Sequence, residues 1–377
     1  MKNKNPFLIS GYQDEDFFCD REEETEQLIK YIENHVNISL FAYRRLGKTG
    51  LVKHVHHKLK SKKSIVCIYL DILGTTELKN FTNLLATSIY NAFPKNNSIG
   101  KKVVKAIQSL RPTINFDEFT GSPSVSFNID NVKQTQTTIQ QLFQFLDNQN
   151  IQISLAIDEF QQVLEYPEKN TEAILRTQMQ ELQNIQFIFC GSNQKMMHEI
   201  FNNAKRPFFA SCTPIHLGYI QKEKYTNFIK EKFNKSKRKI DQEALDFICD
   251  WTMRHTYYTQ YFCNFIHASN HTNINLDIVH SAANEILKVH ENTFFQYRNL
   301  LTTAQWETLK AIGKEQQLFQ PNAKSFIQKY RLGTPSSVNR IIQSLLTKEM
   351  IFYNTSVEKP YYEVYDKFLM RWLAKSE

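Results

Sequence analysis

Apolar and polar positions along the first 218 residues follow an order that predicts strands separated by helices. Short apolar runs rich in β-branched and aromatic residues suit buried strands, and they occur at residues 37–41, 65–71, 153–157, 185–190 and 214–217. Apolar residues at helical spacing lie between them, at 51–59, 76–93, 132–147 and 168–182. Residues 94–131 are the least regular part, and alternation around Gly121 predicts a hairpin insertion there. The whole order predicts an α/β fold with a mostly parallel sheet covered on both faces.

The pattern changes after residue 218. Only helical spacing is found from about 221 to 292, which predicts a helical lid. From 301 onward come two helices, a turn, a third helix and two strand-like runs, the order of a winged helix. Thr334 and Pro335 suit the N-cap and first position of that third helix. We therefore expect an α/β core at 1–218, a helical lid at 219–295 and a winged helix at 296–377.

A phosphate-binding loop, G-x-x-x-x-G-K-[ST], joins the first predicted strand to the next helix, with Ala42 in place of the first glycine. Backbone N–H groups and the positive end of the helix dipole would converge there on an anion. Lys48 would reach the β- and γ-phosphates, and Thr49 would offer its hydroxyl to Mg²⁺. Because alanine resists some backbone angles that glycine tolerates, Ala42 predicts an altered loop that still binds. The expected nucleotide contacts are Arg44, Arg45, Leu46, Gly47, Lys48, Thr49 and Gly50.

Asp158 and Glu159 follow the apolar run at 153–157. In open α/β sheets ligands bind at the carboxyl ends of the strands, where this pair would lie. Asp158 would organise Mg²⁺, and Glu159 would orient and polarise the attacking water. The alternative is an ordinary acidic strand end.

Three further positions are candidates, each with a structural alternative. Asn193, or Ser192 beside it, could sense the γ-phosphate, or the Gly-Ser-Asn turn could serve its geometry alone. Arg206 could stabilise transition-state charge in cis or from a neighbouring subunit, or be a solvated loop arginine. His255, or Arg254 beside it, could touch nucleotide from the lid, or the histidine could pack against the following tyrosines.

Composition adds bounds on partners and compartment. The net charge of +8 in 377 residues favours an anionic partner only mildly. No apolar run reaches the roughly 18 residues of a membrane span, and residues 1–6 lack an apolar signal region. The six cysteines contain no C-x-x-C pair, which is typical of reduced core thiols. We expect a cytoplasmic protein without membrane contact.

Charge in the winged helix does not decide its partner. Residues 301–377 carry 11 Lys and Arg against 7 Asp and Glu, which is thin support for tight DNA binding. The third helix, within 334–348, would present Ser336, Ser337, Asn339, Arg340 and Gln343. DNA and protein both remain candidate partners of this surface.

Nine segments of the chain form a pattern together: 5–7, 18–24, 44–49, 157–160, 190–197, 206–208, 255–258, 365–366 and 372–373. This pattern resembles the archaeal-type ATPase family, P-loop ATPases near the AAA+ and STAND groups that also occur in bacteria such as the Bacteroidetes. The resemblance extends over nearly the whole chain and implies an ASCE/AAA+-like P-loop NTPase fold. It also implies a five-strand sheet with the phosphate-loop strand central, and Asp20, Arg21 and Glu22 near the adenine. Ala42, Arg254 and Thr256 depart from the family pattern.

The function expected from these features is a cytosolic switch that binds and hydrolyses ATP with Mg²⁺. Its nucleotide state, ATP or ADP, would set the placement of the winged helix. Two alternatives stay open: a DNA-binding regulator that only senses nucleotide, and an interaction scaffold with little hydrolysis. Monomer, dimer and ring are all compatible with the sequence.

Overall fold

A computed structural model of the chain describes residues 5–61, 65–93, 98–129, 131–355 and 357–375. The chain forms two compact units, Tyr12–Leu217, here called the sheet unit, and Met1–Gly11 with Gly218–Glu377, here called the helical unit. The expected division into three domains stays a prediction, and its boundary at 295/296 falls inside the continuous helix α11, Leu276–Asn299. None of the helices in the described ranges combines the length and apolar composition of a membrane span.

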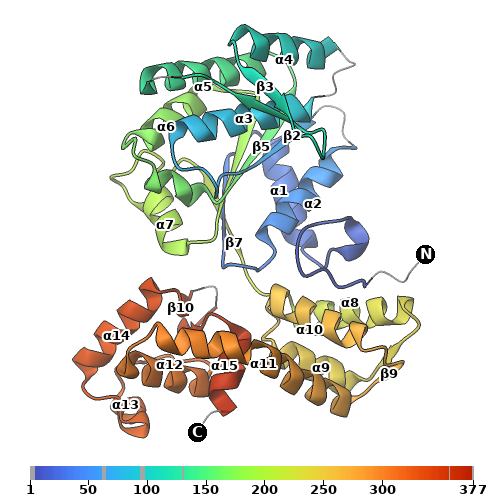
Figure 1. Cartoon of the computed structure of the whole chain (residues 1–377), viewed down its shortest axis with the longest axis vertical. Coiled ribbons are helices and arrows are strands. Elements are labelled where there is room, and N and C mark those ends of the chain that lie inside the picture. Colours follow the sequence, from blue (N-terminus) through green and yellow to red (C-terminus); the bar gives the residue numbers. More distant parts are fainter. Residues whose placement is uncertain (1–4, 62–64, 94–97, 130, 356, 376–377) are drawn as a thin grey trace. The chain divides into compact units, whose positions relative to one another are not determined.

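The sheet unit is built on a five-stranded parallel sheet in the order β2-β5-β6-β1-β7, with helices on both sides (Figure 1). All residues of β1 and β6 are buried, which explains their continuous apolar runs. β1 lies between β6 and the edge strand β7, so it is interior but not central as the resemblance implied. The strands are β1 Ile38–Ala42, β2 Ile65–Asp71, β5 Gln152–Asp158, β6 Ile185–Gly191 and β7 Thr213–Leu217.

The helices of the sheet unit include those predicted from apolar spacing. The full set of helices described in the sheet unit is α1 Glu22–Glu33, α2 Lys48–Leu59, α3 Leu78–Ala92, α4 Ser98–Ser109, α5 Val132–Asp147, α6 Thr171–Glu181 and α7 Gln194–Asn202, with short 3₁₀ helices η1 Glu15–Phe17 and η2 Phe160–Glu165. The hairpin insertion is confirmed as β3 Thr113–Phe116 and β4 Pro123–Ser126. The sequence reasoning missed α4, because its buried stripe is only Gly100, Val103 and Ile107 among lysines.

Three strands of the sheet end at the same edge. Phe41 pairs with Gly191, and Ile157 pairs with Phe189, so the last residues of β1, β5 and β6 lie in neighbouring positions. Parallel strands place their carboxyl ends together. The segments that follow Ala42, Asp158 and Gly191 are therefore brought to one place.

The helical unit begins with four helices and a short parallel pair and ends in a winged helix. Thr334 caps α14 in a capping box with Ser337, and Pro335 is its first residue, which confirms the expected helix start. The elements are α8 Lys222–Lys235, β8 Lys239–Ile240, α9 Gln242–Trp251, α10 Thr256–Ala268, β9 Asn273–Ile274, α11, α12 Thr303–Glu315, α13 Lys324–Tyr330, α14 Pro335–Thr347, β10 Ile351–Asn354, β11 Tyr361–Val364 and α15 Lys367–Lys375.

A fully buried ion pair between Lys367 and Glu363 lies within the winged helix. The amide of Asn354 donates to Glu363 at 3.2 Å, and the hydroxyl of Tyr219 donates to it at 3.0 Å. A buried charge is tolerated only when it is paired and hydrogen-bonded, and each of these contacts satisfies that need. The network fastens the hairpin to α15 and to the segment that enters the helical unit.

A second buried polar contact fastens α2 to β5. His56 Nε2 and Ser154 Oγ lie 3.0 Å apart, and both side chains are buried. Burial, assisted by Lys60, lowers the pKa of His56 to about 4 from its ordinary 6.5. The ring is thus neutral in the folded protein and holds the helix after the phosphate loop against the strand that carries the acidic pair.

This contact makes the sheet unit sensitive to acid. Between pH 6.5 and about 4 the unfolded chain protonates His56 and the folded chain does not, so stability present above pH 6.5 is lost as the pH falls. The loss attributable to this ring is about 3 kcal/mol by pH 4. We expect His56→Gln, measured by thermal unfolding from pH 7 to 4, to show a shallower pH dependence than the wild type. His57→Gln, which alters an exposed neighbour, is the control; equal slopes for all three proteins would contradict the assignment.

Candidate functional site

The phosphate-binding loop connects β1 to α2. Gly47 is the N-cap of α2 with φ of 93°, a left-handed conformation that glycine adopts without steric cost, and Arg45 is also left-handed at φ 62°. Ala42 instead ends β1 in extended backbone and pairs with Leu217. A glycine's conformational freedom is therefore not needed at position 42, which removes the conformational objection to Ala42.

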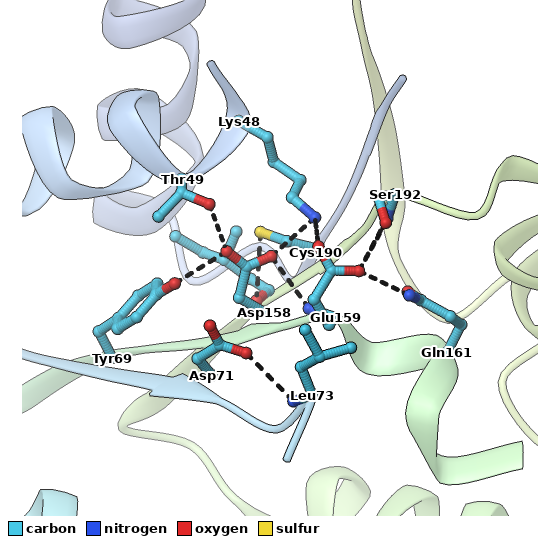
Figure 2. Close-up of polar contacts among 11 residues, drawn as sticks. Lys48, Thr49, Tyr69, Asp71, Leu73, Asp158, Glu159, Gln161, Cys190 and Ser192 are labelled. Atoms are coloured by element: carbon cyan, nitrogen blue, oxygen red, sulfur yellow. Dashed lines mark hydrogen bonds and ion pairs between the residues drawn. The ribbon is translucent and has the colours of Figure 1, made fainter. Parts of the chain in front are cut away.

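Lys48 is the centre of the site. Its Nζ lies 2.8 Å from Asp158 Oδ1 and 2.9 Å from Glu159 Oε1, as Figure 2 shows. The lysine is 6% exposed, so its charge has little access to water. Burial acts to lower the pKa of Lys48, but the two carboxylates outweigh burial and raise it. The lysine is consequently held as a cation between two anions.

Asp158 contacts donor side chains from two elements, α2 and β2. Its Oδ2 accepts hydrogen bonds from the hydroxyls of Thr49 at 2.7 Å and Tyr69 at 2.8 Å (Figure 2). Burial acts to raise the pKa of Asp158, whereas Lys48 and the two hydroxyls lower it, and the net effect is a lowered pKa. The hydroxyl of Thr49 and the carboxylate of Asp158 are hard oxygen donors of the kind that Mg²⁺ prefers. These two side chains fit a magnesium ion.

Glu159 is held from the other side of the site. Its Oε2 accepts from the amide of Gln161 at 2.6 Å and from the hydroxyl of Ser192 at 2.7 Å, while Oε1 faces Lys48. Burial acts to raise the pKa of Glu159, but Lys48, Gln161 and Ser192 lower it overall. Both carboxylates are thus ionised, and each of their four oxygens has at least one donor.

Two candidates after β6 have partners within the sheet unit. Asn193 is the N-cap of α7 and accepts a hydrogen bond from the backbone N–H of Met196, whereas its neighbour Ser192 contacts Glu159. Arg206 forms ion pairs with Glu172 at 3.0 Å and Glu199 at 3.3 Å. The proposed roles of Asn193 and Arg206 toward a nucleotide stay predictions.

The remaining candidates lie around the loop and in the helical unit. Arg44 and Arg45 are exposed and Leu46 is buried, while Gly50 lies in the first turn of α2. Arg21 is buried and its guanidinium binds Glu24 at 2.8 Å. His255 is the buried N-cap of α10, with its ring against Tyr258. Nucleotide contact by Arg21 and His255 stays a prediction.

Sequence reasoning did not find Tyr69 and Gln161. Tyr69 lies inside an apolar strand run, where an aromatic residue is expected for packing alone. Gln161 follows the acidic pair by two residues, a spacing that signals a shared site only if the chain turns sharply. It does so here because Glu159 has a left-handed φ of 56° before η2.

Two segments of the sequence match models of known protein families. Residues 18–254 match the family described as "ATPase domain predominantly from Archaea", and residues 292–375 match that described as "Probable winged helix domain". No curated protein matches the chain.

Solved structures with a similar fold cover nearly the whole chain. A Walker-type ATPase of Pyrococcus abyssi has a TM-score of 0.66 at 15% identity, with 98% of this chain and 99% of that chain covered. The ORC2 protein of Aeropyrum pernix, solved with ADPNP and ADP, has a TM-score of 0.60 at 13% identity, covering 99% and 96%. The ORC1 protein of A. pernix, solved with DNA, has a TM-score of 0.53 at 12% identity, covering 98% and 96%.

The fold is therefore that of a P-loop NTPase with a C-terminal winged helix, and the first family model covers more than half of the chain. The chain belongs to the family of ATPase domains found predominantly in Archaea, which makes ATP its nucleotide and ATP hydrolysis its activity.

Proposed function

We propose that this ATPase is a nucleotide-controlled switch, in which ATP binding and hydrolysis in the sheet unit set the state of the winged helix. The observation that carries the proposal is the bridge from Lys48 to both Asp158 and Glu159. A buried cation held by two anions is poised to exchange them for the anionic oxygens of a triphosphate. Nucleotide binding thereby changes the charge balance of the acidic pair.

Each side chain then has a distinct task. Lys48 binds the β- and γ-phosphates, together with the backbone N–H groups from residues 44 to 50. Thr49 and Asp158 would hold Mg²⁺, whose chemistry is to neutralise charge on the phosphate oxygens. Glu159, released from Lys48, accepts a hydrogen bond from the attacking water and takes its proton. Ser192 lies close enough to Glu159 to orient it.

Further residues complete the proposed nucleotide site. Arg21 contributes near the base, and His255 contributes from α10. Asn193, which caps α7 beside Ser192, senses the γ-phosphate. Arg206 stabilises transition-state charge once it exchanges Glu172 and Glu199 for phosphate.

DNA is the partner that we propose for α14. The exposed side chains at the start of this helix are hydrogen-bonding groups with one cation, Arg340, a set that suits base edges and phosphates. The ORC1 protein with a similar fold was solved with DNA. A protein partner, or a second copy of the chain, is the alternative occupant of this surface.

Lys48→Ala tests the nucleotide site. The change removes the cation that receives the phosphates, so we expect ATP affinity measured by calorimetry to fall roughly 100-fold or more. Lys58→Ala, on the exposed side of the same helix, is the control and should bind ATP as the wild type does. Unchanged affinity of Lys48→Ala would remove the central assignment.

Glu159→Gln tests the water-polarising role. The amide keeps the shape of the side chain but cannot take a proton, so phosphate release should fall about 100-fold or more while ATP binding persists. Glu165→Gln, an exposed acid in η2, should leave phosphate release unchanged. Turnover that survives in Glu159→Gln would place this role on another residue.

Arg340→Ala tests DNA contact. Loss of one arginine contact should weaken binding to duplex DNA about 10-fold and make its salt dependence shallower, measured by gel shift over a salt series with and without ATP. Lys288→Ala, which removes an exposed charge from α11, is the control. If the wild type gives no shift, or a shift insensitive to salt, a protein partner replaces DNA.

A further inference from the structure

Gln161 is a buried polar side chain directed at the acidic pair. It lies in η2 and is 7% exposed, and its amide nitrogen donates to Glu159 Oε2 at 2.6 Å. Figure 2 shows Gln161 approaching the carboxylate of Glu159 beside Ser192, away from Lys48. The contact depends on the left-handed backbone of Glu159, where the chain turns from β5 into η2.

The other end of the Gln161 amide has no partner within the described residues. Its Oε1 is buried and accepts no hydrogen bond. Turning the amide over would place this oxygen against the Glu159 carboxylate, where two acceptors repel each other. The orientation of the Gln161 amide is therefore determined by its donation to Glu159. The buried oxygen without a donor is the unfavourable free-energy term that this orientation carries.

The missing side chain of Gly191, the last residue of β6, leaves the space that the Gln161 amide fills. A Cβ on Gly191 would lie 2.5 Å from Gln161 Oε1 and 2.3 Å from Met197 Sδ, closer than atoms can approach. Glycine at this position lets the glutamine enter the site. The backbone of β6 and the amide of Gln161 thus fit each other beneath the carboxylate.

We infer that Gln161 is a positioning residue for ATP hydrolysis, which with Ser192 anchors Glu159 Oε2 so that Oε1 is the oxygen presented to the attacking water. The inference rests on the proposed role of Glu159. In the structure Oε1 is the oxygen that faces Lys48, while both neutral donors hold Oε2. When a triphosphate draws Lys48 away, Oε1 loses its partner and Oε2 keeps both of its donors. The carboxylate then stays in place with one oxygen available.

Gln161→Met tests this inference, because methionine has a similar length and volume but no N–H donor. We expect kcat for ATP hydrolysis to fall about 10-fold while KM, ATP affinity by calorimetry and the thermal unfolding temperature stay close to the wild type. Gln161→Asn, which keeps an amide but withdraws it by one methylene, should lower kcat in the same way. Gln162→Met is the matched control, since this neighbour donates to the backbone oxygen of Thr75 and not to the site.

The outcomes separate this inference from the proposed function. If Glu159→Gln loses turnover while both Gln161 variants keep wild-type kcat, the positioning role is overturned and the role of Glu159 stands. If the Gln161 variants raise KM and weaken ATP binding without a loss of kcat, the residue supports nucleotide binding and the inference also fails. If Glu159→Gln hydrolyses ATP as fast as the wild type, the role of Glu159 and this inference fail together.

Discussion

The structure of the site depends on one constraint, the need to keep the charge of Lys48 paired while the side chain is buried. A lone ammonium in a low-dielectric interior is strongly unfavourable, and removing one partner from a buried ion pair typically costs 3–5 kcal/mol. The sheet meets this need by ending β5 with Asp158 directly opposite the start of α2. The contact of His56 with Ser154 and the left-handed Gly47 both keep α2 in the position that makes this pairing possible.

In the proposed function, the same constraint links nucleotide binding to catalysis. Without a nucleotide, the charge of Lys48 is paired within the described site by the two carboxylates of the acidic pair. Glu159 Oε1 is therefore bound to the lysine. Phosphate oxygens compete for the same ammonium because a triphosphate carries more negative charge than the two carboxylates, and lysine binds phosphate as a point charge. The carboxylate proposed to activate water therefore becomes available only when its substrate is present. The pairing of Glu159 with Lys48 is by itself enough to explain why a site without nucleotide would not activate water, and no domain motion is required.

The sequence was sufficient to predict those structural features that arise from local periodicity and from motifs with fixed spacing. The parallel strands, the turn from Gly47 into α2 and the Thr334 cap all follow from residues adjacent in the chain. The contribution of Tyr69 could not be predicted, since an apolar strand hides a hydroxyl directed at Asp158. The position of β1 beside the edge strand could not be predicted either, because strand order depends on long-range packing. Ala42 departs from the motif without conformational consequence, because its backbone is extended at the end of β1.

The two acids differ in ways that suit them to different tasks. Asp158 is 2% exposed and is fixed by Thr49, Tyr69 and the backbone N–H of Glu159, so it has little freedom. Glu159 has a side chain 17% exposed and stands on a left-handed backbone that costs roughly 1–2 kcal/mol in a non-glycine residue. Strain of this kind persists where the surroundings enforce it, and here the turn directs one carboxylate toward Thr49 and the other toward Ser192. The left-handed backbone of Glu159 is thus what separates a carboxylate suited to a metal from one suited to a water.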